Sequence, residues 1–386
     1  MRLDGIRVLD MTRLLPGPYA TQLLADAGAD VIKVEDTGMG DYARHGDEQT
    51  SRGVSPMFDA INRGKRSISI DLKNDDGREA FYELVKDADV IFEQFRPGVV
   101  EKLGVDYETI REYNDDIVYC SLSGYGQTGP YAGRVGHDLN YVGVAGLLDM
   151  TREDETMAPQ IPGYQIGDLG GGLFSAFSIL GALLSRELGT TGGEYIDVAM
   201  TDVVASFSQH VAPAALRGDN PRPGGTTLTG QFACYDIYET KDGRYVTLGA
   251  LEPKFWDAFC SEVGRVDLIE RHMEGTEELR EEVAEVFASK TLAEWMAELS
   301  DETMTGPVNT PEEMVAHEQL LARGVVEHPD DEDVPPRVGF PAQSTAEPPE
   351  SPTEIPQQGE HTEDILEAAG FDETEIAALR DADAIR

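Results

Sequence analysis

The sequence predicts an α/β protein with a large layered domain and a smaller α+β domain. Short apolar stretches alternate with amphipathic stretches of helix length through the first half of the chain, which is the pattern of parallel βαβ units. After residues 217–230, which are rich in Gly, Pro, Asn and Asp, the pattern changes to paired strands followed by helices. A length of 386 residues also suits two domains better than one.

The first half of the chain is expected to form most of the parallel sheet. Strands are predicted in IRVLDM, DVIKVE, RSISIDL, DVIFEQF and IVYCSLS, and helices in PYATQLLADAG and GREAFYELVKDA. Leu23, Leu24 and Ala27 form one apolar stripe in the first of these helices. The loop after IRVLDM contains Pro16 and Pro18 in place of a G-x-G-x-x-G turn, which disfavours an NAD-dependent enzyme.

The second half of the chain predicts a linker and a separate small domain. A buried helix is expected near residues 172–186, a strand in GEYIDVAM, and a long helix through TDVVASFSQHVAPAAL. FACYDIYET, DGRYV and VTLGA predict strands with a turn at Asp242 and Gly243, and KFWDAFCSEVG and LREEVAEVFA predict amphipathic helices. We therefore predict a large domain at residues 1–200, a linker helix and loop at 201–224, and a small α+β domain at 225–325.

The C-terminal segment is expected to be extended first and helical at its end. Residues 327–358 are acidic and proline-rich, with little to bury, so they are predicted to run extended over the surface. HTEDILEAAG and FDETEIAALR predict two short helices, with Thr362 and Asp372 as N-caps.

The charge of the chain is strongly negative. It has 31 Lys and Arg against 73 Asp and Glu, for a net charge of −42. Such a surface repels phosphate backbones and anionic lipid, so neither nucleic acid nor a membrane is expected as a partner. The dispersed acidic residues favour the cytoplasm of a salt-loving microbe, where ions screen self-repulsion; an acidic mesophilic protein is the alternative. The N-terminus lacks the pattern of a signal peptide.

The cysteines and histidines give no metal or disulfide pattern. Cys120, Cys234 and Cys260 include no C-x-x-C pair, and the seven histidines include no H-x-x-x-H pair. Each cysteine is interpreted as a small buried apolar residue. We therefore expect no metal and no separate cofactor.

Three polar residues are candidates for chemistry, and each also has an ordinary structural interpretation. Asp168 enters the stretch GDLGGG, where a ligand can approach the backbone closely, but Asp before a helix is also a common N-cap. His137 in GHDLNY is either a base or a hydrogen-bonded structural residue. Glu252 in GALEPKFW follows a strand and suits the cap of a helix that begins near Pro253.

Six segments together resemble the family III coenzyme A transferases of the CaiB/BaiF type. They are LLPGPYATQLLADAGADVIKVE, FRPGV, GYGQTGPY, GHDLNY, GDLGGG and GRYVTLGALEP, in the order of that family and at about its spacing. The resemblance covers nearly the whole chain, including GEHTEDILEAAG. It is closest to the 2-methylacyl-CoA racemase branch, which has a histidine followed by Asp-Leu-Asn-Tyr.

The resemblance implies both a fold and an activity. The fold would be a Rossmann-like large domain completed by residues 326–386, in a homodimer of two interlocked chains. The activity would invert the α-carbon of an acyl-CoA substrate through an enolate, with His137 and Asp168 as the two bases. Glu252 matches the acid that orients the histidine.

The resemblance also implies substrate contacts around these bases. Residues 167–171 are expected to form a turn whose backbone N–H groups donate to the enolate oxygen. Asp138 is expected to join this network or to cap the next helix, and the second interpretation is preferred. The expected contacts are Gly136, Asp138, Tyr141, Gly167 and Gly170.

Binding of CoA requires cations for its phosphates. Lys73, Arg96 and Lys102 lie in segments that contact CoA in the family, and cations are scarce in this chain.

The sequence departs from the racemase pattern, which often has an Arg-Pro after its third strand. Glu35 and Asp36 stand there instead, and Lys33 or Arg44 is expected to substitute.

Transfer of CoA between carboxylic acids is the alternative activity. Asp168 would then attack the acyl-CoA carbonyl and form a mixed anhydride, without a histidine partner. Both reactions use Asp168, so His137 separates them, and it favours racemisation. A CoA-binding protein without activity is disfavoured, because all the acid–base residues are present.

Overall fold

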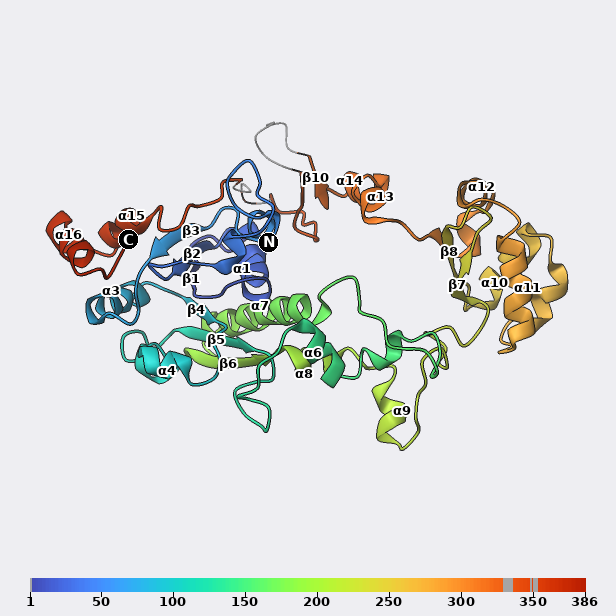
Figure 1. Cartoon of the computed structure of the whole chain (residues 1–386), viewed down its shortest axis with the longest axis horizontal. Coiled ribbons are helices and arrows are strands. Elements are labelled where there is room, and N and C mark those ends of the chain that lie inside the picture. The colour runs from blue at the N-terminus through green and yellow to red at the C-terminus, as the bar shows by residue number, and fades with distance from the viewer. Residues whose placement is uncertain (1, 329–335, 348, 350–352) are drawn as a thin grey trace. The chain divides into compact units, whose positions relative to one another are not determined.

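The computed structural model divides the chain into two compact units (Figure 1). It describes all residues except 1, 329–335, 348 and 350–352. The first unit consists of Met1–Leu147, Pro162–Phe207 and Arg323–Arg386, and the second of Leu148–Ile161 and Ser208–Ala322. The sequence places residues 148–161 in the large domain, whereas the structure assigns them to the second unit.

The first unit is built on a six-stranded parallel sheet with the order β3-β2-β1-β4-β5-β6. Its strands are β1 (Arg7–Asp10), β2 (Asp30–Glu35), β3 (Arg66–Ser69), β4 (Val90–Glu93), β5 (Val118–Ser123) and β6 (Glu194–Ala199). The strands β1, β2, β4 and β5 are largely apolar, whereas β3 and β6 are mixed, and the predicted α/β class with a parallel sheet is confirmed. The strand order reverses between β1 and β4, which makes this position the topological switch point.

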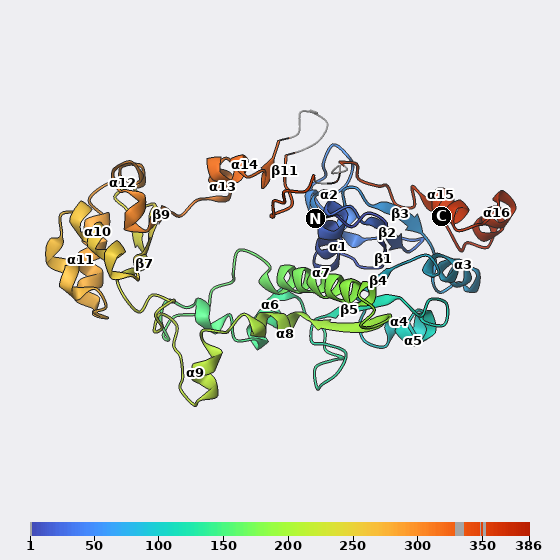
Figure 2. The same ribbon diagram turned by 180° about the vertical axis from the view of Figure 1, so that it is seen from behind.

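Helices cover both faces of this sheet. They are α1 (Pro16–Asp26), η1 (Tyr42–Arg44), α2 (Pro56–Ile61), α3 (Asp75–Val85), α4 (Val99–Leu103), α5 (Tyr107–Ile110), α6 (Asp138–Val144), α7 (Ile166–Glu187), α8 (Met200–Ser206), α15 (Thr362–Ala368) and α16 (Glu373–Asp381). Successive strand residues enter opposite cores: Val8 lies in a cluster with Leu24 of α1 and Ile179 of α7, and Leu9 in a cluster with Phe81 of α3. Helices α1 and α7 lie side by side in both views (Figures 1 and 2).

Helix α7 begins at Ile166, earlier than the predicted start near residue 172. Its glycines are poor helix formers, but tertiary packing requires them. A Cβ on Gly172 would stand 2.3 Å from the carbonyl oxygen of Pro16, and one on Gly171 would stand 2.5 Å from Cγ of Met200. These glycines therefore allow the first turns of α7 to pack closely on α1 and α8.

The opposite face of α7 is exposed and apolar. Leu173, Phe177 and Leu184 are 54%, 66% and 60% exposed. Among the described residues, α7 is the one helix whose length and composition would allow it to cross a membrane, with 44% of its apolar window buried. Core helices of soluble proteins meet the same criterion, so this is weak evidence for a membrane span.

The C-terminal segment packs on the β3 edge of the sheet. Ile385 forms an antiparallel bridge with Ile70, just beyond β3. Asp372 is the N-cap of α16, as predicted. The prediction for α15 is wrong by one residue, because His361 precedes the helix and Thr362 is its first residue. The strands β10 (Val326–Glu327) and β11 (Arg337–Val338) pair at the start of the segment predicted to be extended, part of which lies outside the described residues.

The second unit contains the antiparallel sheet β7-β8-β9 and a cluster of helices. Its elements are η2 (Asp149–Thr151), α9 (Ala212–Leu216), β7 (Tyr235–Glu239), β8 (Tyr245–Gly249), α10 (Pro253–Glu262), η3 (Val266–Arg271), α11 (Glu277–Phe287), α12 (Leu292–Glu298), η4 (Asp301–Thr303), β9 (Thr305–Pro307), α13 (Pro311–Val315) and α14 (Glu318–Ala322). The predicted turn at Asp242 and Gly243 joins β7 to β8, and Gly243 has a φ of 72°. The three-residue strand β9 was not predicted, because it is too short to show a pattern.

The long helix predicted through residues 201–216 is wrong. The chain forms α8, breaks, and forms the separate short helix α9. Pro213 stands in the first turn of α9, where its missing N–H costs nothing, but it could not continue a helix from α8.

Candidate active site at the carboxyl edge of the parallel sheet

The loops after β1 and β4 meet at the switch point, where doubly wound sheets bind their ligands. Gln94 joins these loops: its Oε1 accepts a hydrogen bond from the N–H of Gly17 at 3.0 Å, and its Nε2 donates to the carbonyl of Arg13 at 2.7 Å. The guanidinium of Arg13 lies 5.3 Å from the ring centroid of Tyr42 and 5.9 Å from that of Phe95. This part of the edge therefore combines a cation with aromatic surface.

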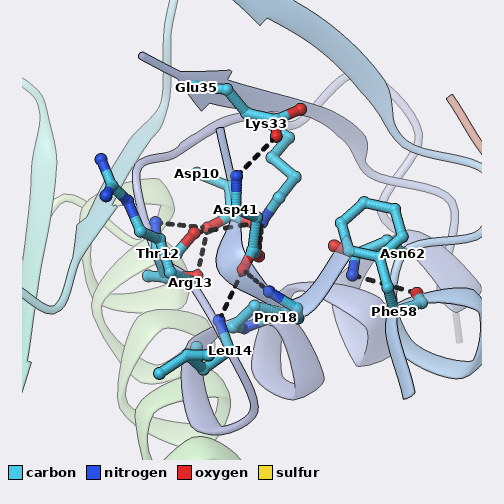
Figure 3. A network of polar contacts seen from close by, with 12 residues as sticks. Asp10, Thr12, Arg13, Leu14, Pro18, Lys33, Glu35, Asp41, Phe58 and Asn62 are labelled. Atoms are coloured by element: carbon cyan, nitrogen blue, oxygen red, sulfur yellow. Dashed lines mark hydrogen bonds and ion pairs between the residues drawn. The ribbon is translucent and has the colours of Figure 1, made fainter. Parts of the chain in front are cut away.

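A buried ion pair holds the loop after β1 in a strained conformation (Figure 3). Lys33 Nζ lies 2.8 Å from Asp41 Oδ2, and both side chains are fully buried. Asp41 Oδ1 accepts a hydrogen bond from the N–H of Leu14 at 3.0 Å. Leu14 has a φ of 64°, which costs a non-glycine residue about 1–2 kcal/mol. The ion pair thus offsets backbone strain next to the switch point.

The two cations proposed from the sequence for the adenine end of CoA, Lys33 and Arg44, form ion pairs in the interior of the first unit. Lys33 pairs with Asp41, and Arg44 makes two hydrogen bonds to the carboxylate of Glu35. Both are buried, so the expectation that either replaces the family's Arg-Pro is wrong. Asp36 pairs with Arg13 at 3.0 Å.

His137 is the exposed N-cap residue of α6, and its backbone is firmly placed. Its N–H donates to Asn140 Oδ1 at 3.0 Å. The hydroxyl of Tyr141 donates to the carbonyl of Gly136 at 2.5 Å, directly before His137. A Cβ on Gly124 would stand 2.3 Å from the Tyr141 ring. Tyr141 is 7% exposed and supports the backbone beside His137, and its contact with the substrate stays a prediction.

Asp138 caps α7 and thereby brings the two candidate bases together. Its Oδ1 accepts hydrogen bonds from the N–H of Gly167 at 2.6 Å and of Asp168 at 3.0 Å. The sequence leaves Asp138 two roles, joining the network of the bases or capping the next helix, and the second is preferred. The helix that Asp138 caps is α7, which begins 28 residues further along the chain, and not α6, whose first residue it is.

The turn predicted at residues 167–171 is also wrong, since these residues belong to α7. The N–H groups of Gly167 and Asp168 are bonded to Asp138, and that of Leu169 donates to Gln165. None of these three N–H groups is free for an enolate.

Electrostatics link His137, Asp168 and Arg96. Burial raises the pKa of Asp168 to about 6, and the charge of Asp138 acts in the same direction, while His137 opposes it. Burial also raises the pKa of Tyr141 to about 12, with Asp168 acting in the same direction and Arg96 opposing it. The charges of His137 and Arg96 therefore act on the same small group of residues.

The three predicted phosphate-binding cations are all exposed. Lys73 follows β3 and Arg96 follows β4, so both belong to loops at the carboxyl edge of the sheet, and Lys102 lies in α4. Within the described part of the chain, none of the three forms an ion pair. In a protein with so many carboxylates, unpaired cations at this edge are available for an anionic ligand.

Two residues predicted for the site, Gly170 and Glu252, have structural positions that do not by themselves indicate a role in the site. Gly170 faces α8, since a Cβ there would stand 3.1 Å from the ring of Phe207, so this glycine serves helix packing. Glu252 belongs to the second unit, where it is the exposed N-cap residue of α10 and its side chain makes no capping hydrogen bond. Among the described residues, no group of three or more His, Cys, Asp or Glu is placed to hold a metal ion.

Sequence reasoning missed Gln94 and Arg13. Each follows a strand that borders the switch point, and a polar residue in this position is the sequence feature that could have indicated a role in the site. The sequence alone does not give the strand order, so it could not show that these two loops meet.

The model of the CoA-transferase family III matches residues 3–362. The chain belongs to CoA-transferase family III. The resemblance stated from the sequence segments is therefore confirmed.

Relatives within family III carry out two kinds of reaction. The chain is 35% identical to the alpha-methylacyl-CoA racemase of Homo sapiens, over 98% of this chain and 96% of the relative. It is 34% identical to the succinyl-CoA:mesaconate CoA-transferase of Haloarcula marismortui, over 96% of this chain and 97% of the relative. Membership of family III thus supports a CoA-dependent enzyme without deciding between racemase and transferase.

A solved structure of this family has the same fold. The crystal structure of a CaiB/BaiF family protein from Brucella suis aligns with a TM-score of 0.83 at 30% identity, covering 95% of this chain and 98% of that one.

Proposed function

We propose that this family III member is a racemase that inverts the α-carbon of 2-methylacyl-CoA thioesters. The observation that supports it most is that Asp138, the neighbour of His137, accepts a hydrogen bond from the Asp168 N–H, and that the charge of His137 acts on the Asp168 carboxyl group. A thioester α-proton is weakly acidic, so its removal needs a positioned base and a stabilised enolate.

The two bases work on opposite faces of the α-carbon. One of them, His137 or Asp168, takes the proton, and the other, in its protonated form, returns a proton to the opposite face. A carboxyl group with a pKa of about 6 suits both tasks, because it is a stronger base than an ordinary Asp and still a usable acid. Each turnover exchanges the protonation states of the pair, so the reaction runs in both directions.

CoA transfer remains the second candidate function. Its support is the similarity to the succinyl-CoA:mesaconate CoA-transferase. In this reaction Asp168 attacks the thioester carbonyl, and CoA leaves as the thiolate. His137 has no required part in it.

We also propose that the enzyme is a homodimer, as the resemblance implies. Leu173, Phe177 and Leu184 follow each other at helical spacing on the exposed face of α7. A continuous apolar stripe of this kind is typical of a protein interface. The absence of a separate cofactor and the cytoplasmic location stay predictions.

The test is an exchange assay in heavy water. The protein is incubated with a (2R)-2-methylacyl-CoA without acceptor acid, and mass spectrometry and chiral analysis follow the α-carbon. Deuterium uptake with inversion is the expected result. Absence of exchange, together with CoA transfer once succinate is added, would overturn the racemase proposal in favour of transfer.

Two variants refine this test. His137→Gln should reduce exchange at least about 100-fold, the usual contribution of an acid–base group, while CoA binding is retained. Asp168→Asn should remove both exchange and transfer. Full exchange activity in His137→Gln would contradict the two-base assignment.

A further inference from the structure

Glu93 is a buried carboxylate at the end of β4 that the proposed reaction does not use. It is 2% exposed, and among the described residues it has no ion-pair partner. Burial raises the pKa of Glu93 to about 7; the hydrogen bonds from Ser121 and the N–H of Phe95 oppose this, and Glu101 of α4 and Asp197 of β6 reinforce it. An unpaired acid in this position is costly, so its contacts indicate what it does.

The two oxygens of Glu93 accept hydrogen bonds from two different segments. Oε2 accepts from the N–H of Phe95 at 2.6 Å, at the start of the loop that carries Arg96. Oε1 accepts from the hydroxyl of Ser121 on the neighbouring strand β5. Glu93 therefore ties the loop after β4 to the adjacent strand.

The same contacts continue toward the segment before His137. Gln127 donates from Nε2 to the Ser121 hydroxyl at 2.8 Å, and its backbone N–H donates to Asp197 Oδ2 at 3.0 Å. Gln127 lies in the loop that leads from β5 to His137. One hydrogen-bonded chain thus connects the loop of Arg96 with the loop of the candidate base.

Arg96 itself is exposed, and within the described residues it forms no ion pair with a carboxylate. Its backbone position depends on the loop: Phe95 is held at its N–H by Glu93, and its ring lies 5.9 Å from the guanidinium of Arg13. Gly98, with a φ of 83°, ends the loop before α4.

We propose that Glu93 is a positioning residue that fixes the loop at residues 95–98 and thereby aims Arg96 at a phosphate of the CoA substrate. This inference rests on the proposed function, since it requires that the chain binds CoA through Arg96. An apolar side chain at position 93 would leave the Phe95 N–H and the Ser121 hydroxyl without their acceptor, and the loop would lose its anchor.

The test measures the affinity of the full-length protein for free CoA by calorimetry. Glu93→Leu should weaken binding roughly tenfold, the effect of losing one charge-assisted hydrogen bond. Glu93→Gln should bind within about twofold of the unmodified chain, because the amide oxygen can accept from Phe95 and the NH₂ group can donate to Ser121. In the exchange assay, Glu93→Leu should raise KM and leave kcat nearly unchanged.

A double-mutant cycle with Arg96 separates positioning from a general structural effect. Arg96→Gln should also weaken CoA binding, and the double variant should bind no more weakly than Arg96→Gln alone, because Glu93 acts through Arg96. Unchanged affinity in Glu93→Leu, or penalties that multiply in the double variant, would overturn the proposal for Glu93. If the unmodified chain does not bind CoA, or if Arg96→Gln binds normally, the proposed CoA site itself fails.

Hydrogen–deuterium exchange on the same variants serves as the control for folding. Hydrogen–deuterium exchange should accelerate at the Phe95 amide in Glu93→Leu and not in Glu93→Gln. Should Glu93→Leu fail to fold, Glu93→Met replaces it, because methionine has about the length of glutamate but no strong acceptor for the Phe95 N–H. Normal CoA affinity in Glu93→Met would then contradict the proposal.

Discussion

At the scale of single residues, Asp138 sets both the position and the charge state of Asp168. Its carboxylate holds the first N–H groups of α7, and its negative charge adds to the effect of burial on Asp168. The same side chain therefore orients a candidate base and raises its pKa. This arrangement keeps Asp168 close to the point where it can both accept and release a proton near neutral pH.

Asp138→Asn separates these two effects. The amide oxygen still accepts from the N–H groups of Gly167 and Asp168, so the cap is retained, while the like charge is lost. When Asp168 takes the proton, its carboxyl group must be ionised, so this exchange should rise with pH in the unmodified enzyme and reach half its limit near the pKa of Asp168, about 6. In Asp138→Asn this ascending limb of the pH profile should move to lower pH, because the pKa of Asp168 falls when the like charge is removed. The shift should be partial, because burial is the main cause of the raised pKa.

The measurement is the pH dependence of deuterium exchange. Asp202→Asn, which removes the same charge from an exposed position on α8, is the matched control and should leave the limb in place. An unmoved limb in Asp138→Asn, or an equal shift in both variants, would show that Asp138 does not tune Asp168.

At the scale of elements, α7 has two apolar faces with different roles. One face, rich in glycine and alanine, packs in the core with α1 and the sheet. The other carries the exposed stripe of Leu173, Phe177 and Leu184. An exposed stripe on a helix of this length has two ordinary explanations, a partner chain or a lipid surface.

The acidic surface favours a partner chain. Phe177→Lys places a charge in the middle of the stripe and should shift the protein from dimer to monomer in light scattering. Thr374→Lys, an equal change in charge at an exposed position on α16, should leave the dimer intact. A monomeric unmodified protein, or loss of binding to lipid vesicles in Phe177→Lys, would contradict the dimer.

At the scale of the whole molecule, the net charge of −42 opposes compact folding at low ionic strength. Exposed carboxylates repel one another over the Debye length, which falls from about 10 Å at 0.1 M salt to about 3 Å at 1 M. The buried pairs Lys33–Asp41 and Arg44–Glu35 are shielded from the solvent and gain nothing from screening. Added salt should therefore relieve repulsion while leaving the internal pairs in place.

The melting temperature should accordingly rise as KCl increases from about 0.1 M to about 1 M. Calorimetry or circular dichroism measures it. At pH 4 many carboxylates are protonated, so the dependence on salt should become smaller there. A melting temperature that is flat or falls with KCl at pH 7 would contradict stabilisation by screening, and with it the expected adaptation to high salt.

The sequence by itself determined the local elements and the family. Apolar runs of strand length and the turn at Gly243 are local properties, because strand periodicity and a positive φ depend on neighbouring residues. The motifs around His137 and Asp168 indicated the family because their chemistry needs those residue types.

Only the tertiary structure decided which residues meet and which are available. Helix α7 contains Gly171 and Gly172, although glycine is a poor helix former, because Met200 and Pro16 leave no room for a Cβ there. Asp138 caps a helix far along the chain, and the charge of Lys33 is neutralised by Asp41 in a buried ion pair. Most of these contacts join segments that are distant in sequence, and all of them depend on strand order and packing, which no local pattern encodes.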